Sequence, residues 1–177
     1  MSTPNKIGYF ERITTTNFAL WFSFVAYMGM SIAFVVIMQV WDFWVIDEMF
    51  SKERILAHIE ALSDKQRLVH VWTTATLDVA YPFAYGTFQA GMAYRYLGRW
   101  GRWVAPLGLI CIPVDLIEGF AQVMLLTGST EYISLKIVAT PVKLALYFSS
   151  LGFAIVAGGR LAHRQRSLRR LEDVGDG

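Results

Sequence analysis

The segment from Val104 to Leu126 is the feature that most limits what this chain can fold into. It is apolar and long enough to cross a bilayer, yet it carries two carboxylates near its middle, Asp115 and Glu118. Because a carboxylate in hydrocarbon is costly, both side chains are expected to face protein or a wet cavity. Gln122 follows four residues later, so the three polar groups share one helical face, which we treat as a candidate functional site.

The composition is that of an integral membrane protein. Hydrophobic residues make up 55% of the 177 residues and charged residues 17%, against roughly 25% charged in ordinary soluble domains. The net charge is +2 and the basic residues gather at segment ends, which argues against nucleic acid binding. The lone cysteine, Cys111, excludes an internal disulfide and a cysteine metal cage, and its apolar surroundings predict a small buried residue.

The hydrophobic pattern predicts an all-α fold, a polytopic membrane four-helix bundle that forms a single integral membrane domain over residues 1–177. The predicted spans are about 18–40, 71–94, 104–126 and 132–157. The first is longer than the apolar core of a signal peptide, so we expect it to stay as a span. Gly158 and Gly159 are expected to end the last helix, which leaves a basic C-terminal tail over 160–177.

The loop between the first two spans contains an amphipathic pattern that predicts an extramembrane helix over about 51–62. This helix either lies on lipid or covers the polar site. The cluster Thr14 to Asn17 is expected to cap the first span, and Ser63 with Gln66 forms a capping box that starts the second. Pro82 predicts a kink beside Asp78, because proline removes the hydrogen bond to the carbonyl of that residue.

Basic residues are unevenly divided between the two sides of a four-span protein. Four lie on the side of the 42–70 loop, namely Lys52, Arg54, Lys65 and Arg67. Ten lie on the side of the termini and the third loop, namely Lys6, Arg12, Arg95, Arg99, Arg102, Arg160, Arg164, Arg166, Arg169 and Arg170. The positive-inside rule then predicts a multi-pass protein of the inner (plasma) membrane with both termini cytoplasmic.

Charged residues of three spans fall at similar depths. Asp78, Asp115, Glu118 and Lys143 all lie roughly 10–17 Å below the outer surface, at 1.5 Å of rise per residue. We expect these four candidate catalytic residues to converge in an acidic pocket, with Lys143 as the counter-ion. Lys136 lies nearer the surface, so three acids would face one deep ammonium. Either at least one acid then holds a proton near neutral pH or a cation is present, and for the proton Glu118 is the choice over Asp115.

Further polar residues share faces with these charges and are candidate ligand-binding residues. They are Tyr81, Tyr85, Gln89, Gln122, Thr140 and Tyr147. His70, two turns before Asp78, is interpreted as a surface residue rather than a ligand. The sequence predicts no metal site and no cofactor, since no two histidines occupy facing spans.

The pattern Asp78-x-x-Tyr81-Pro82-x-x-Tyr85, together with Asp115-x-x-Glu118 and Lys143, resembles a functionally uncharacterised family of small four-span bacterial integral membrane proteins. The resemblance covers roughly residues 50 to 160. It implies the four-span architecture and the same set of polar residues, and it implies no activity. The family has asparagine after the glutamate and an aromatic residue after the lysine, whereas this chain has Gly119 and Leu144.

These features predict a pocket that binds a lipophilic small molecule or lipid, or acts on it by acid/base chemistry. Two alternatives stay open: a structural or assembly subunit of a larger membrane complex, and a small oligomeric proton-linked transporter. The expected partners are membrane lipids, a lipophilic ligand, and further copies or subunits, but not nucleic acid. In the structural alternative the buried charges serve only to fix helix packing.

Overall fold

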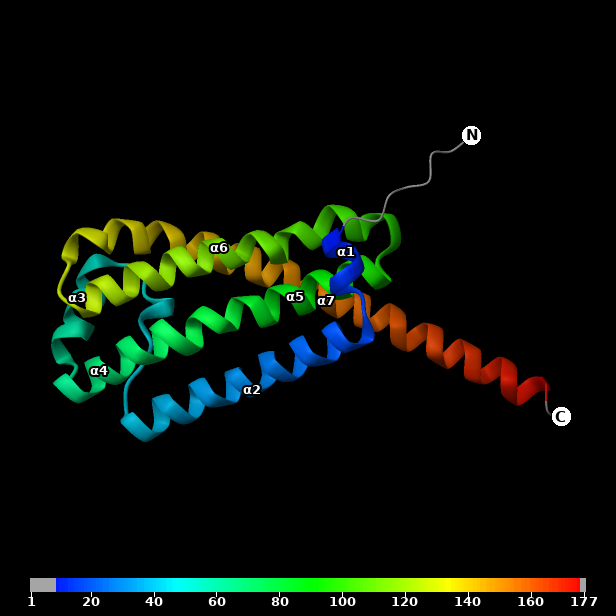
Figure 1. The fold of residues 1–177 in the computed structure, drawn as a ribbon, viewed down its shortest axis with the longest axis horizontal. Coiled ribbons are helices and arrows are strands. Elements are labelled where there is room, and N and C mark those ends of the chain that lie inside the picture. The colour runs from blue at the N-terminus through cyan, green and yellow to red at the C-terminus, as the bar shows by residue number, and fades with distance from the viewer. Residues whose placement is uncertain (1–8, 176–177) are drawn as a thin grey trace.

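A computed structural model describes residues 9–175 of the chain, which form helices and short connections with no strand in that range (Figure 1). The prediction of an all-α fold is therefore confirmed. Residues 1–8, including Lys6, and residues 176–177 of the predicted tail lie outside the described part.

Four long helical rods lie side by side. They are α2 (Asn17–Trp41), the continuous rod of α4 (Asp64–Thr73), a π-helical turn (Thr74–Asp78) and α5 (Val79–Tyr96), then α6 (Gly101–Leu126) and α7 (Ile133–Gly175). Three stretches of the described chain are long and apolar enough to cross a membrane: Asn17–Trp41, Gly98–Leu126 and Thr130–Ser167. The described part is thus a helical protein with several potential membrane-crossing segments.

Short elements close both ends of the rods. One end holds the 3₁₀ turn Ile46–Glu48 and α3 (Lys52–Ala61), and the 3₁₀ turn Thr130–Tyr132 precedes α7. The other end holds α1 (Tyr9–Thr14) and the 3₁₀ turn Gly98–Trp100 between α5 and α6.

The amphipathic helix α3 packs on protein. Ile55 is fully buried and Ile59 is 7% exposed, in one apolar cluster with Phe43, Leu125 and Leu126. Each Å² of apolar surface that is buried contributes about 25 cal/mol of favourable free energy. The buried apolar contacts of α3 therefore hold this segment over the end of α6. Of the two interpretations of the predicted 51–62 helix, the structure favours a cover over the bundle end.

The helix starts follow the sequence signals. Thr16 caps α2, since its Oγ1 accepts the N–H of Ala19 at 3.1 Å. Ser63 and Gln66 form the predicted capping box at the start of α4, with the Ser63 N–H donating to Gln66 Oε1 at 3.0 Å. Both predictions are confirmed, and these local bonds fix where the first two rods begin.

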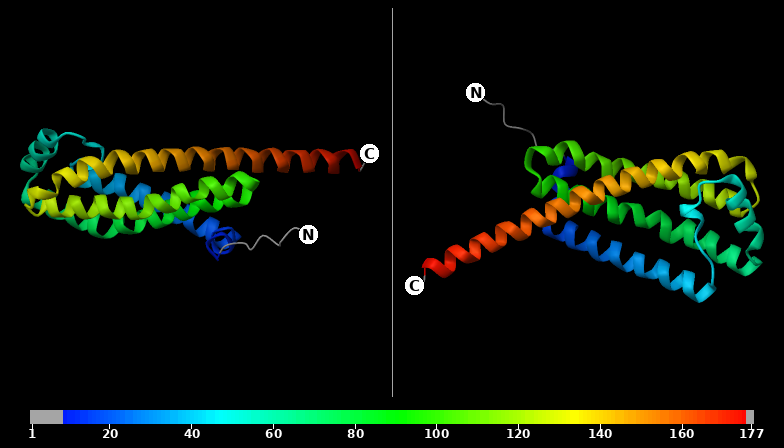
Figure 2. Two further views of the ribbon diagram at one scale, coloured as in Figure 1. Left: turned by 90° about the horizontal axis from the view of Figure 1, so that it is seen from above. Right: turned by 180° about the vertical axis from the view of Figure 1, so that it is seen from behind.

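The last helix is longer than the sequence predicted. α7 continues through Gly158 and Gly159 to Gly175, so the prediction that the glycine pair ends the helix is wrong. A glycine cap requires a positive φ, which the described glycines show only at Gly98 and Gly128. Two helical glycines cost about 1 kcal/mol each against alanine, and good helix formers on both sides outweigh that cost. The 160–175 part of α7 projects beyond the other helices (Figure 2).

The core is formed by α5, α6 and α7, with α2 attached to one side through α5. Only Leu20 and Ser23 of α2 are buried, so most of its apolar surface faces outward. α5 and α6 approach closely where Gly86 meets Gly108. A Cβ at Gly86 would lie 2.7 Å from the Gly108 carbonyl oxygen, which is closer than two such atoms pack.

We therefore expect Gly86→Ala to lower the free energy of unfolding by about 1–3 kcal/mol, because the added methyl forces two backbones apart. Gly152→Ala is the matched control, since a Cβ there meets no atom within 4 Å. The control should be neutral or stabilising by up to about 1 kcal/mol through helix propensity. Thermal unfolding in detergent micelles measures both variants. Equal destabilisation by the two would contradict the close contact.

Candidate functional site

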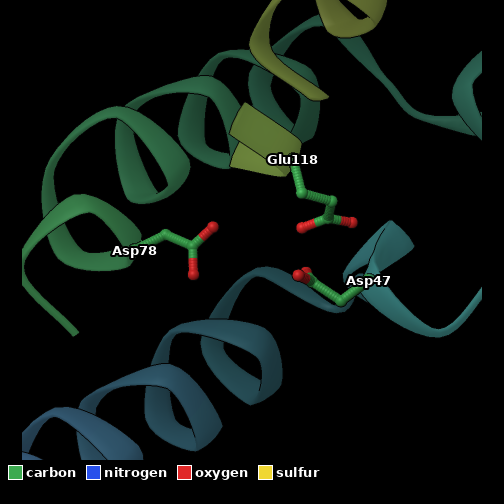
Figure 3. Close-up of side chains that lie close together, drawn as sticks. All are labelled: Asp47, Asp78 and Glu118. Atoms are coloured by element: carbon green, nitrogen blue, oxygen red, sulfur yellow. The ribbon is translucent and has the colours of Figure 1, made fainter. Parts of the chain in front are cut away.

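Charged side chains from four elements meet inside the bundle. Asp47 comes from the 3₁₀ turn, Asp78 from the π-helical turn, and Glu118 from α6. Figure 3 shows these three carboxylates facing a common space. α6 also contributes Asp115, and α7 contributes its two deep lysines. The four residues expected to converge therefore do lie together. Two more join them, namely Lys136, which the sequence analysis placed nearer the surface, and Asp47, which it did not consider.

The backbone around Asp78 departs from a regular α-helix. Residues 74–78 form a π-helical turn in place of the simple kink expected from Pro82. Proline provides no N–H for the Asp78 carbonyl, which allows the helix to change its hydrogen-bonding register here. On the facing helix, Gly119 makes room for the carboxylate. A Cβ on Gly119 would lie 3.4 Å from Asp78 Oδ2.

Glu118 is the centre of the ion network and is fully buried. Its Oε1 accepts from Lys136 Nζ at 2.5 Å and from Thr140 Oγ1 at 2.8 Å. Its Oε2 accepts from Lys143 Nζ at 2.7 Å. Two ammonium groups and a hydroxyl therefore surround this one carboxylate. The sequence analysis had placed only Lys143 beside Glu118, and the proton expected there stays a prediction.

Lys136 is that second lysine. The sequence placed it near the membrane surface, but its side chain is fully buried. The difference arises because α3 and its apolar cluster cover the end of α6 and the start of α7. A charge close to the end of a helix is thereby shielded from water by a segment distant in sequence.

Lys143 is the counter-ion of two of the three expected acids, Asp115 and Glu118, and it pairs with Asp47 instead of Asp78. Its Nζ lies 2.8 Å from Asp47 Oδ1, 2.7 Å from Glu118 Oε2 and 3.1 Å from Asp115 Oδ1. The Tyr85 hydroxyl donates to Asp115 Oδ2 at 2.7 Å. This lysine therefore joins the carboxylates of the 3₁₀ turn to those of α6, and it ties the bundle end to the bundle core.

Asp47 was not among the predicted site residues. It reaches the network because Phe43 and Ile46 are buried and draw the 42–50 segment over the bundle end. Gln122 Nε2 donates to Asp47 Oδ1 at 2.9 Å. Burial raises the pKa of Asp47, but the ammonium groups of Lys143 and Lys136 lower that pKa more, so it lies well below its usual range.

Asp78 differs from the other three acids. Within residues 9–175 its carboxylate takes part in no hydrogen bond and no ion pair, although oxygens of Asp47 and Glu118 lie within 4.8 Å. The network thus contains four carboxylates against two ammonium groups, and the unpaired acid faces like charges. Such an arrangement favours a proton or another cation at Asp78.

A cavity of about 300 Å³ lies between α2 and α7, with α5 behind it. Its polar wall is formed by Asp47, Asp78, Asp115 and Lys143, with the rings of Tyr81, Tyr85 and Tyr147. Its apolar wall is formed by Phe34, Met38, Val45, Leu144 and Phe148. Phe148 is 62% exposed, so the apolar side of the cavity reaches the outer surface of the bundle. The cavity therefore joins a charged interior to the outside between two helices.

The predicted ligand-binding residues divide into three groups. Tyr81, Tyr85 and Tyr147 line the cavity. Gln122 and Thr140 lie behind it, where they bond to Asp47 and Glu118. Gln89 does not reach the site, since its Oε1 accepts from the hydroxyl of Ser150, whose backbone lies further along α7. About three helical turns separate Gln89 from Asp78, and a shared helical face does not mean a shared depth.

Two further predictions concern single residues. Cys111 is fully buried, with its Sγ 3.2 Å from the Tyr85 hydroxyl, which confirms the expected burial. His70 was interpreted as a surface residue, but it is fully buried against Phe43, with ring centroids 5.0 Å apart.

Asp47, Asp78 and Glu118 are the residues that could hold a metal ion, since one oxygen of each lies within 4.8 Å of the others. The ammonium of Lys143, however, already binds Asp47 at 2.8 Å and Glu118 at 2.7 Å. A metal ion would have to displace this lysine from two of its three partners. The arrangement fits a lysine-bridged acid cluster better than a divalent cation site.

Comparisons with protein-family models, with curated proteins and with solved structures give no match to this chain.

The pairing of Lys136 with Glu118 gives a stability prediction. Lys136→Met should lower the free energy of unfolding by about 3 kcal/mol, the scale of a broken buried ion pair. Adding Glu118→Gln should restore part of that loss, because the buried carboxylate is then removed. Lys65→Met, at an exposed position of α4, is the control and should change little. Chemical unfolding in micelles measures all three. A double variant no more stable than Lys136→Met alone would rule out the pairing.

Proposed function

We propose that this chain is a four-span integral membrane protein, with α2, the rod of residues 64–96, α6 and α7 as its spans. The three apolar stretches support this proposal. So does the outward face of α2, where large apolar side chains are exposed as a lipid-facing helix requires. They include Phe18, Trp21, Phe22, Val25, Ile32, Val35, Val36 and Val40.

The proposed orientation has both termini in the cytoplasm and the α3 end on the outer side of the inner membrane. Its support is the ten-to-four division of Lys and Arg between the two ends. The site would then lie in the outer half of the bilayer. Membership of the resembling family of small bacterial four-span proteins is part of the same proposal, and it rests on the polar pattern of spans two to four.

The proposed function is to bind a lipophilic small molecule or lipid in the cavity, and to act on it by acid/base chemistry. The observation that carries this proposal is the cavity itself, which has a charged wall, an apolar wall and an opening between α2 and α7. A molecule dissolved in the bilayer enters such an opening sideways without crossing water. Its polar group then meets Asp78 and Asp115 while its apolar part stays against Phe34 and Phe148.

The network supports a division of roles. Glu118, Lys136 and Thr140 do not line the cavity and satisfy one another, which suits a structural role in fixing α6 against α7. Asp78 and Asp115 line the cavity and are the acid/base candidates. Lys143 touches both groups and would hold Asp115 ionised. The assembly-subunit alternative accounts for the first group but gives no role to the cavity-facing one.

The cavity is tested by filling it. Leu144→Trp places an indole in the apolar wall, while Val142→Trp adds the same side chain at an exposed position of the same helix. Protein extracted in native lipid should retain a lipophilic molecule in the wild type and in Val142→Trp, and lose it by tenfold or more in Leu144→Trp. Mass spectrometry of the retained lipids measures this loss. Identical lipid profiles in all three proteins would refute a binding pocket.

The orientation is tested by labelling intact cells. In a Cys111→Ala background, a cysteine at Glu60 in α3 should react with an impermeant maleimide, because α3 faces the outside. A cysteine at Arg166, in the exposed part of α7, should react only after the cells are broken. The opposite pattern would move the cavity to the cytoplasmic half of the membrane.

A further inference from the structure

The cavity wall contains one acidic side chain, Asp78, that pairs with no other group of the described protein. Asp78 lies at this wall with no hydrogen bond or ion pair within residues 9–175. The facing helix α6 brings Gly119, which has no side chain to donate, and Glu118, whose carboxylate lies within 4.8 Å and is an acceptor. A carboxylate in such a place is neutralised either by a proton or by a cation that enters the cavity.

The cations already present do not reach Asp78. Lys136 is bound by Glu118 and Thr140, behind the cavity. Lys143 lines the cavity, but its charge is shared among Asp47, Asp115 and Glu118 at 2.7 to 3.1 Å. The wall around Lys143 therefore carries more negative than positive charge, and a group that enters beside Asp78 meets a negative field.

Asp115 adds a second acceptor on the same wall. Its side chain is only 4% exposed, and it lines the cavity. Oδ2 accepts from Tyr85, and Oδ1 is ion-paired with Lys143 Nζ at 3.1 Å. Because each carboxylate oxygen has two lone pairs, Asp115 adds acceptor capacity to the wall that carries Asp78.

Tyrosine rings complete the surroundings of Asp78. Tyr81, Tyr85 and Tyr147 line the cavity, with ring centroids 5.3 Å apart for the first pair and 5.0 Å for Tyr85 and Tyr147. Within each pair the two rings meet edge to face. The three tyrosines thus form an aromatic part of the cavity wall. Aromatic faces next to carboxylates attract ammonium groups and not anions.

From this combination we infer that the ligand of the proposed pocket is a lipophilic amine, whose ammonium group lies between Asp78 and the tyrosine rings and whose hydrocarbon tail leaves between α2 and α7. The inference rests on the proposed function and adds to it that the ligand is positively charged. The tail lies against Phe34, Met38 and Phe148. A fatty acid is excluded as the preferred ligand, because its carboxylate would face Asp78 and Asp115.

The inference is tested by photolabelling in nanodiscs of zwitterionic lipid at pH 7. One probe is a dodecyl trimethylammonium ion with a diazirine on its tail, and the other is 1-dodecanol with the same diazirine. Peptide mass spectrometry should place the ammonium adduct on residues of the apolar wall, such as Phe34 or Phe148. Unlabelled dodecyltrimethylammonium should compete at least about tenfold better than unlabelled 1-dodecanol, the scale of one charge-assisted contact.

Two variants separate the charge from the cavity. Asp78→Asn should weaken labelling by the ammonium probe by about tenfold and leave labelling by the alcohol probe unchanged, which also shows that the variant is folded. Asp42→Asn removes the same charge at an exposed position outside the cavity and should change neither probe. Asparagine tolerates the left-handed conformation of this residue, whose φ is 49°.

The outcomes distinguish the inference from the proposed function. Equal labelling by both probes, unchanged in Asp78→Asn, would overturn the amine and keep the lipophilic pocket. Competition by Ca²⁺ or Mn²⁺ against the ammonium probe, and not against the alcohol probe, would also overturn it and assign a metal ion to Asp78. Failure of both probes to label the cavity walls would overturn the pocket itself.

Discussion

The contact of Glu118 with two ammonium groups is the interaction on which the rest of the structure depends. It joins α6 to α7 at two heights, through Lys136 and Lys143. Two buried ammonium groups next to a single carboxylate are stable only if further acids balance the extra positive charge. Asp47 and Asp115 provide that balance at Lys143. Asp47 belongs to the segment after α2, which packs over the bundle end. The ion network therefore also holds this segment in place, so the position of the charges and the fold depend on each other.

This coupling explains how a charged site persists between apolar helices. Ions in a low-dielectric interior are costly unless paired, and the pairs here are short and further bonded by Thr140, Gln122 and Tyr85. α3 and its apolar cluster keep water from the Lys136 side. On the opposite side the network faces the cavity, where Asp78 lies without a partner in the described chain. One face of the network is therefore closed and the other is open to a ligand.

The cavity is bordered on one side by α2, a helix that is only weakly attached to the rest of the bundle. α2 packs mainly on α5, and near the cavity it meets the rest of the protein through hydroxyl contacts. Tyr27 bonds to Tyr147 at 2.6 Å and Ser31 to Tyr81 at 3.1 Å. Few apolar side chains of α2 are buried, so separating it from α7 exposes little core. Under the proposed function, a helix held in this way would give lipid-soluble molecules a side entrance, while the contacts among α5, α6 and α7 hold the charges in place.

The sequence by itself determined the helices and the polar faces, since these depend on local periodicity, capping and proline, as Thr16, Ser63 and Pro82 illustrate. It also identified Lys143 as the partner of the α6 acids, because equal depth in facing helices follows from rise per residue. Only the tertiary structure decided the burial of Lys136 and His70 and the entry of Asp47 into the site. Those three depend on how the 42–62 segment folds back over the bundle end, a long-range contact that leaves no periodic signal. The surroundings of Glu118 were decided in the same way, because no local sequence pattern shows which distant side chains reach a buried acid.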